Sequence, residues 1–188
     1  MRTLLAISCL LISVGAPSPA IAFDNERKGF LLGGSIGAGL QAPLLETIGH
    51  ERLVEGALAT GFRIGWGLDS KTEVYIYNGG VTGVSFFYVP IPYTNSVWAG
   101  ALRRYVHESP SFYASAGAGV GSWSILGIPA GSGLGILAGV GYEYRKHWSL
   151  EVDGTYTNLG RPGAPFDDPA QEFGPTYTLA LRFSGTAY

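Results

Sequence analysis

His147, Ser149 and Glu151 have the residue types that nucleophilic catalysis requires. A histidine can take the proton of a serine hydroxyl, and a carboxylate can orient that histidine. These residues alternate with Trp148 and Leu150, however, and a period of two indicates a strand. The set begins directly after a basic dipeptide, at what we expect to be a tight turn. We therefore interpret His147 as a turn residue and predict no catalytic residue.

Other motifs give no sign of a cofactor. The glycine-rich stretches 117–121 and 131–135 are followed neither by a helix pattern nor by Lys-Ser/Thr, which a phosphate-binding loop requires. Cys9 is the only cysteine and lies in an apolar N-terminal run; without that run, disulfides and cysteine-based zinc sites are excluded. A net charge of -2 provides no basic field for nucleic acid. We predict no metal, no cofactor and no nucleic-acid partner.

Charged residues are sparse and interrupt alternating apolar segments. Isolated charges inside a narrow polar bore would be costly, so ion pairs across the bore are expected. The predicted charge network consists of Arg63, Glu73, Glu143, Glu151, Asp153 and Arg182, together with either Arg103 or Arg104. Glu151 or Asp153 could meet Arg182 if the last two strands are neighbours. A network that fills the bore is the favoured interpretation, and a polar path for small solutes is the alternative.

The segment 134–156 shows which elements would position these charges. Its even-numbered residues from Leu134 to Tyr144, and again from Trp148 to Tyr156, are mostly apolar or aromatic. The odd-numbered residues are mostly small, polar or charged. A soluble sheet would carry lysine, threonine and glutamate on its wet face, whereas a glycine-lined face fits a narrow lumen with lipid outside. We interpret the segment as two adjacent strands of a membrane β-barrel.

Composition agrees with a membrane barrel. Charged residues make up 14% of the chain, against about 25% in soluble domains, and mean hydropathy is +0.20. Arg2, the apolar run 4–14 and Ala20-Ile21-Ala22 predict an export signal over 1–22, leaving a barrel domain over 23–188. A lipoprotein attached through Cys9 is a weaker alternative. A helical membrane hairpin is disfavoured, because 116–141 contain nine glycines and a proline.

Eight alternating segments can be counted. The expected strands are 30–40, 58–68, 72–78, 96–106, 112–121, 134–144, 148–157 and 176–183. Short turns are expected at 69–71, 107–110 and 145–147, and long loops at 41–55, 79–95, 123–132 and 158–173. Extension of the third strand into 79–95 is an alternative for that segment. Strict alternation of short and long connections is typical of barrels with tight periplasmic turns and free external loops. The sequence predicts an all-β, closed, eight-stranded antiparallel up-and-down transmembrane barrel.

Aromatic residues fall into two groups. The outward-facing set is expected to form girdles at the membrane interfaces: Trp66, Trp98, Tyr142, Tyr144, Trp148 and Tyr156. Phe86, Phe87 and Tyr88 fall in the expected loop 79–95, where exposed apolar side chains often mark a partner.

The closing pattern Tyr177-x-Leu179-x-Leu181-x-Phe183 resembles the last strand of Gram-negative outer-membrane barrels, which the barrel-insertion machinery reads. Together with the export signal and strand count, the chain resembles the OmpA/OmpX-type superfamily of small barrels. Ser184 to Tyr188 depart from it, since such chains usually stop at the aromatic residue; either the strand is longer or a tail follows. His147-x-Ser149 is loosely similar to lipid A deacylases, but Leu150 replaces part of their His-Ser-Asn continuation.

These observations predict a non-enzymatic outer-membrane barrel with a structural or surface-interaction role through its external loops. The implied partners are outer-membrane lipid, lipopolysaccharide, the insertion machinery and a host or surface ligand. A small-solute channel and a lipid A-modifying enzyme are the alternatives.

Overall fold

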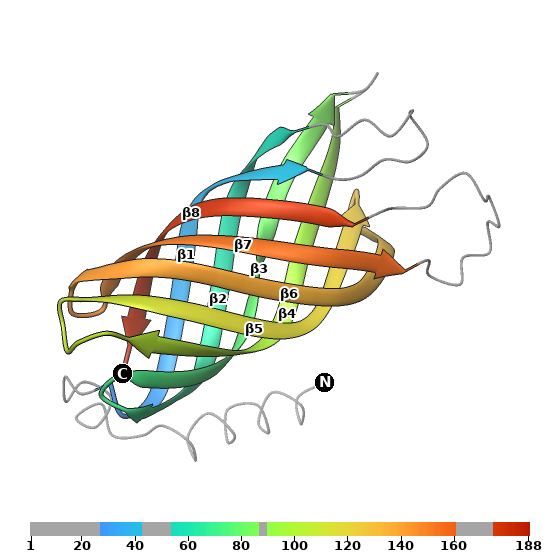
Figure 1. The fold of residues 1–188 in the computed structure, drawn as a ribbon. Helices are drawn as coiled ribbons and strands as arrows, with labels where there is room; N and C mark the ends of the chain where they lie inside the picture. Colours follow the sequence, from blue (N-terminus) through green and yellow to red (C-terminus); the bar gives the residue numbers. More distant parts are fainter. Residues whose placement is uncertain (1–26, 43–53, 87–89, 161–174) are drawn as a thin grey trace, which may run out of the picture.

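The chain forms one closed antiparallel barrel in the computed structural model, which describes residues 27–42, 54–86, 90–160 and 175–188. The strands follow one another around the barrel in chain order, and β8 closes on β1 (Figure 1). They are β1 (Gly29–Ala42), β2 (Glu55–Asp69), β3 (Thr72–Phe86), β4 (Pro90–Tyr105), β5 (Ser111–Ile125), β6 (Ile128–Arg145), β7 (Trp148–Gly160) and β8 (Thr176–Ala187). The predicted eight-stranded up-and-down barrel is confirmed.

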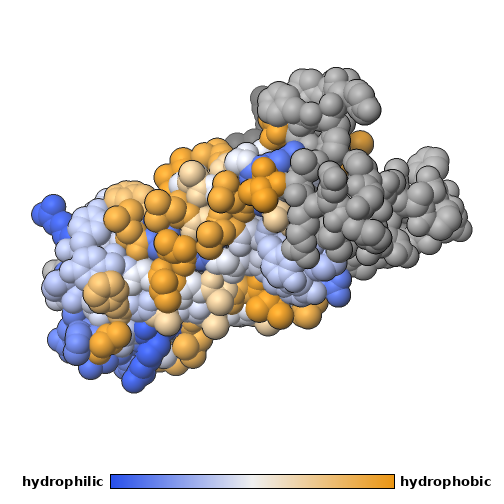
Figure 2. Space-filling model, turned by 45° about the horizontal axis from the view of Figure 1, so that its top comes forward, coloured by the Kyte–Doolittle hydropathy of each residue, from blue (hydrophilic) through white to orange (hydrophobic). Residues whose placement is uncertain are grey.

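The alternation along each strand separates two environments. Leu134, Val140, Trp148 and Leu179 face outward, whereas Glu143, Glu151 and Arg182 are buried in the bore. Hydrophobic side chains cover much of the barrel wall in Figure 2, and hydrophilic residues gather at one end. A barrel with a polar interior and an apolar wall is stable only where hydrocarbon surrounds it. None of the described residues belongs to a helix long and apolar enough to cross a membrane.

The strand register fixes the geometry of the bore. A row of paired residues that starts at Tyr113 passes through the other seven strands and returns to β5 at Trp123, ten residues further along. This offset of ten residues is the shear of the barrel. With eight strands it implies a strand tilt of roughly 35–45° and an interior about wide enough for side chains to fill.

The two ends of the barrel differ. One end, here called the terminal end, holds Arg27 and Tyr188 together with the turns at 70–71, 106–110 and 146–147. The opposite end, here called the loop end, holds the connections between β1 and β2, β3 and β4, β5 and β6, and β7 and β8.

Two segments expected as long loops are mostly strand, and for 79–95 the alternative, extension of the third strand, is the correct one. Most of 79–95 belongs to β3 and β4, and 123–132 is a hairpin whose turn is only Leu126 and Gly127. Both turn residues have positive φ, as in the tight turns that suit twisted hairpins. Hydroxyl side chains interrupt the apolar outward face of these hairpins toward the loop end, where Thr82 contacts Thr94 at 3.1 Å and Ser96 contacts Ser122 at 2.9 Å. The strands therefore continue past the apolar band, and their loss of hydrophobicity resembles a loop in the sequence.

Other boundaries also move. Strand β8 runs on to Ala187, so the residues after Phe183 extend the strand, and β7 continues to Gly160. The export signal, Phe87 and Tyr88 lie outside the described residues, as do positions 43–53 and 161–174 of the expected loops.

Candidate functional site: a closed charge network in the bore

Glu151 on β7 is the centre of the buried charges. Its Oε2 accepts hydrogen bonds from Arg103 at 2.8 Å, Arg63 at 3.3 Å and the Tyr113 hydroxyl at 2.7 Å. Its Oε1 accepts a further bond from Ser184. One carboxylate thus joins residues from β2, β4, β5 and β8 across the bore, in the half nearer the terminal end. Such dense pairing offsets the cost of burying the charges.

Arg182 forms a second ion pair toward the loop end. Its Nε donates to Asp153 Oδ1 at 2.6 Å, and its Nη2 lies 3.4 Å from Asp153 Oδ2. The same Nη2 lies 3.4 Å from the carbonyl oxygen of Gly80 on the opposite wall. This side chain therefore spans the bore as well as pairing with its neighbouring strand.

Glu73 forms a third centre toward the terminal end. Its Oε1 accepts hydrogen bonds from Tyr188 at 2.6 Å and Tyr105 at 3.0 Å, and Arg103 lies 4.0 Å from its Oε2. Burial, followed by the charge of Glu73, raises the pKa of Tyr188 far above its ordinary value. The phenol therefore stays protonated and serves as a donor.

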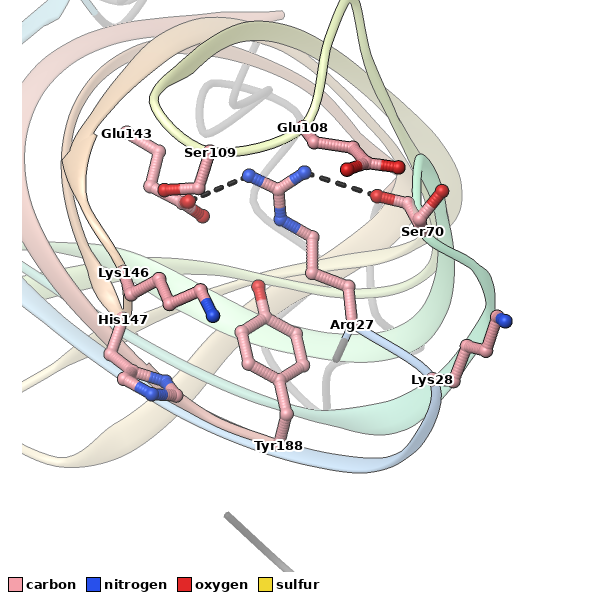
Figure 3. A pocket seen from close by; sticks show the side chains of 9 residues that line it. All are labelled: Arg27, Lys28, Ser70, Glu108, Ser109, Glu143, Lys146, His147 and Tyr188. Carbon is pink, nitrogen blue, oxygen red and sulfur yellow. Dashed lines mark hydrogen bonds and ion pairs between the residues drawn. The ribbon is translucent and has the colours of Figure 1, made fainter. Parts of the chain in front are cut away.

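Arg27 closes the terminal end. Its Nη2 donates to Glu143 Oε1 at 2.6 Å, and its Nη1 donates to the carbonyl oxygens of Ser70 at 3.1 Å and His107 at 3.3 Å. Its guanidinium lies 3.7 Å from the centre of the Tyr105 ring. Although burial alone would lower the pKa of Arg27, its bond to Glu143 raises it above the ordinary value. The residue lines a pocket of about 280 Å³ with Glu108, Lys146 and Tyr188 (Figure 3).

The buried charges balance. Among the described residues, four arginines (Arg27, Arg63, Arg103, Arg182) and four carboxylates (Glu73, Glu143, Glu151, Asp153) are buried. The network is therefore formally neutral, and its members occur from the terminal mouth to the level of Asp153.

The six residues predicted for the network all face the bore, but the prediction was incomplete. The alternatives Arg103 and Arg104 are resolved in favour of Arg103, since the Arg104 side chain is exposed and lies 3.8 Å from Asp69. Arg27 was missed because it precedes the first alternating segment. Tyr113 and Tyr188 were missed because the prediction considered only charged residues. Alternation along the strand places Tyr113 on the bore side, and this could have identified it.

The His147, Ser149 and Glu151 side chains do not form a relay. His147 Nδ1 lies 2.8 Å from the carbonyl oxygen of Thr186, and its φ of 72° places it in the turn before β7. Ser149 faces inward, with its Oγ 3.1 Å from the Tyr113 hydroxyl. Within the described strands and turns, no three His, Cys, Asp or Glu side chains gather as metal ligands would.

The predicted girdle residues point away from the bore. Trp66, Tyr142, Tyr144 and Trp148 lie on the strand segments nearest the terminal end, and Tyr156 pairs with Tyr177 nearer the loop end. Trp98 lies in the middle of β4, with Ser96 and Thr94 next on its face. It therefore marks the place where the wall of these strands turns from apolar to polar. For the predicted contact residue Phe86, only its place at the end of β3 is described.

Comparison with solved structures gives the same architecture. Ail, the attachment invasion locus protein of Yersinia pestis, matches with a TM-score of 0.54 and 15% identity over 86% of this chain and 99% of that chain. Neisserial surface protein A (NspA) matches with a TM-score of 0.54 and 11% identity over 85% of this chain and 96% of that chain. A second Ail structure, in complex with the heparin analogue sucrose octasulfate, has a TM-score of 0.53 and 14% identity over 85% and 99%.

No family model matches the chain, and neither does any curated protein. At these identities the structural likeness shows the fold alone. The chain has the fold of the small eight-stranded outer-membrane barrels, as its resemblance to that superfamily predicted.

Proposed function

We propose that this protein is a non-enzymatic outer-membrane barrel with a closed bore, and that it acts through surface contacts at its loop end. In this proposal the terminal end faces the periplasm and the loop end faces the exterior, as the placement of the tight turns favours. The balanced charge network carries the proposal, because it occupies the space through which a solute would have to pass.

Because the bore is closed, we expect the protein to conduct no ions across a planar bilayer. The refolded protein should give no conductance steps in planar membranes. A variant with alanine at every arginine that crosses the bore and at Glu151 should conduct, since this removes all three obstructions: Arg27, Arg63, Arg103, Glu151 and Arg182. Heat-modifiable migration on a gel should show that both proteins are folded. Steps from the wild type at the frequency of the multiple variant would support the channel alternative.

The β5–β6 hairpin offers a contact surface at the loop end. Leu126 and Ile128 are 65% and 68% exposed, and they lie beyond Ser122 and Ser124. Apolar side chains held above a polar collar are exposed to water rather than lipid, and such patches often mark a binding surface. The hydrogen bond from Leu126 N to Pro92 O, at 2.9 Å, fixes the tip against the neighbouring hairpin. This tip is a better supported contact site than the predicted Phe86-Phe87-Tyr88 patch.

Replacing Leu126 by asparagine and Ile128 by threonine tests this surface. Cells that display the double variant should lose adhesion to immobilised host matrix proteins that retain cells displaying the wild type. Stability should not fall, because asparagine tolerates the φ of 54° at position 126 better than leucine. Val106→Thr changes an exposed apolar residue at the opposite end and should leave adhesion intact. Equal adhesion by the wild type and the double variant, or by cells without the protein, contradicts a contact role for the tip.

The outward aromatic end of β8 supports a partnership with the insertion machinery. Phe183 stacks on Trp148 with ring centres 5.1 Å apart and faces outward, so the pattern that resembles the insertion signal is displayed on the wall. A lipid A-modifying activity has less support, because His147 and Ser149 engage other partners at the terminal end.

A further inference from the structure

An open groove of about 560 Å³ lies on the outer wall of the barrel, where β8 closes on β1. The register places four of its residues in one outward-facing row across β2, β1, β8 and β7: Phe62, Gly34, Gly185 and Trp148. Among the described strands, Gly34 and Gly185 are the only outward-facing glycines that pair with each other. Two large aromatic side chains therefore border a floor that has no side chains. We refer to this feature as the β1–β8 groove.

The open part of the floor is Gly34. A Cβ on Gly34 would meet only one atom within 4 Å, the carbonyl oxygen of Gly61 at 4.0 Å. Over Gly185 the floor is partly covered, because a Cβ there would lie 3.0 Å from the ring of Trp148. Leu32 and Ala187 continue the groove toward the terminal end. The lining is almost entirely apolar, as a surface in contact with hydrocarbon requires.

The β1–β8 groove meets a basic rim at the terminal end. His147 lines both the groove and the polar pocket of Figure 3, which also contains Lys28 and Lys146. Arg145 and Lys146 are exposed and lie in the turn that leads into Trp148. Arg145 pairs with Trp148 at the start of β7. An apolar groove and a cationic rim are thus continuous on one side of the barrel.

The carboxylates of the terminal end leave this rim positive. Two of them are already paired within the protein: Glu143 with Arg27, and Asp69 with Arg104. Glu108 belongs to the turn between β4 and β5, on the side of the closed barrel opposite to β8 and β1. An α-carboxylate at Tyr188 would offset only one of the positive charges.

We propose that the β1–β8 groove binds one anionic phospholipid of the phosphatidylglycerol type. An acyl chain lies in the groove, and the phosphate lies at Arg145 and Lys146. Hydrocarbon surrounds this wall, so an acyl chain is the apolar group available to fill the groove, and basic residues at a membrane surface attract anionic headgroups. Trp148 stands between the two parts, at the level where tryptophan contacts the membrane interface.

A lipid fits this surface better than a second copy of the chain. Two copies inserted in the same orientation and related by a two-fold axis would bring two basic rims together, and these repel each other. The proposal rests on the proposed function for its membrane setting, because with the terminal end toward the periplasm the lipid belongs to the periplasmic leaflet. It does not depend on the closed bore or on the contact surface at Leu126.

Native mass spectrometry of the whole protein, released from detergent micelles, tests the site. Titration with dioleoyl phosphatidylglycerol should give a single tightly retained lipid. Dioleoyl phosphatidylcholine, which has the same chains and no net charge, should bind at least about fivefold more weakly. Glycerol 3-phosphate has the phosphate without the chains, and it should not be retained. Heat-modifiable migration on a gel should show that every protein used is folded.

Two pairs of matched variants locate the lipid. Gly34→Leu fills the groove and should weaken the apparent Kd for phosphatidylglycerol about tenfold or more, since the excluded chain loses several buried CH₂ groups. Gly100→Leu adds the same side chain to the outer wall of β4, where a Cβ meets no atom within 4 Å, and should leave the Kd unchanged. Lys146→Gln should weaken binding about fivefold, whereas Lys71→Gln, in the turn between β2 and β3, should not.

Three results would overturn the proposal. Equal Kd values for the Gly34→Leu and Gly100→Leu proteins would mean that the lipid is held only as part of the general lipid shell. Retention of glycerol 3-phosphate as tight as that of phosphatidylglycerol would mean that the groove takes no part. A dimer in the spectra that Gly34→Leu abolishes, without any effect on lipid retention, would assign the groove to a second copy. Each of these results leaves the closed bore and the loop-end contacts of the proposed function standing.

Discussion

Glu151→Gln is expected to lower the free energy of unfolding by about 3–5 kcal/mol, as the loss of one partner of a buried ion pair does. The Glu151 side chain is 8% exposed and accepts from two arginines and a tyrosine. Glutamine keeps the shape but leaves the charges of Arg63 and Arg103 without their shared anion. Urea unfolding in detergent micelles, followed by tryptophan fluorescence, measures the change.

Glu108→Gln is the matched control. Glu108 is an exposed residue of the turn between β4 and β5, so its change should stay within about 0.5 kcal/mol. Adding Arg103→Met to Glu151→Gln should recover part of the loss, because one unpaired charge is then removed with its partner. A Glu151→Gln protein as stable as the Glu108→Gln protein would show that the charge network does not hold the barrel together.

Gly37→Val should prevent proper closure of β1 on β8. Gly37 pairs with Arg182, and a Cβ on it would lie 1.9 Å from the carbonyl oxygen of Leu181 and 2.7 Å from the Arg182 Cα. Since these are backbone atoms, the two strands would have to separate, which also moves Arg182 away from Asp153. We expect a loss of about 3 kcal/mol or more, at the upper end of the range for overpacked sites. The urea midpoint and the fraction of heat-modifiable protein give the result.

Gly100→Ala provides the comparison for this variant. Gly100 faces outward on β4, and a Cβ there meets no atom within 4 Å. Its stability should remain within about 0.5 kcal/mol of the wild type. A Gly37→Val barrel with the urea midpoint of the wild type would mean that β1 and β8 pack less tightly than the structure indicates.

The alternation of the sequence predicts which face each residue occupies. Strand count, antiparallel order and the inward side of Arg63, Glu73 and Arg182 all follow from a period of two, because neighbouring side chains in a strand must face opposite sides. The period does not reveal where a strand leaves the lipid. In β3 and β4 the outward face becomes a mixture of glycine, proline and threonine with Val84 while the hydrogen-bonded ladder continues, so 79–95 looks like a loop in the sequence although most of it is strand.

The sequence predicts the pairing of the buried charges less well than it predicts which side of the strand they occupy. Arg182 with Asp153 could be anticipated because consecutive strands are neighbours. The contacts of Glu151 with Arg63 and Arg103 span the bore and depend on the shear, which no local pattern encodes. The role of Arg27 depends on contacts with the turns at Ser70 and His107, which no alternating pattern predicts.

The balanced set of charges has a consequence for assembly. Glu143 is neutralised by a residue that precedes β1, Glu73 is bonded by the residue that follows β8, and Glu151 joins strands from both halves of the chain. A half-formed sheet in the bilayer would therefore present ionised groups to hydrocarbon without their counterparts. Insertion should consequently be cooperative: strand by strand intermediates remain unpopulated, and the transition from adsorbed chain to embedded protein is completed in one kinetic event.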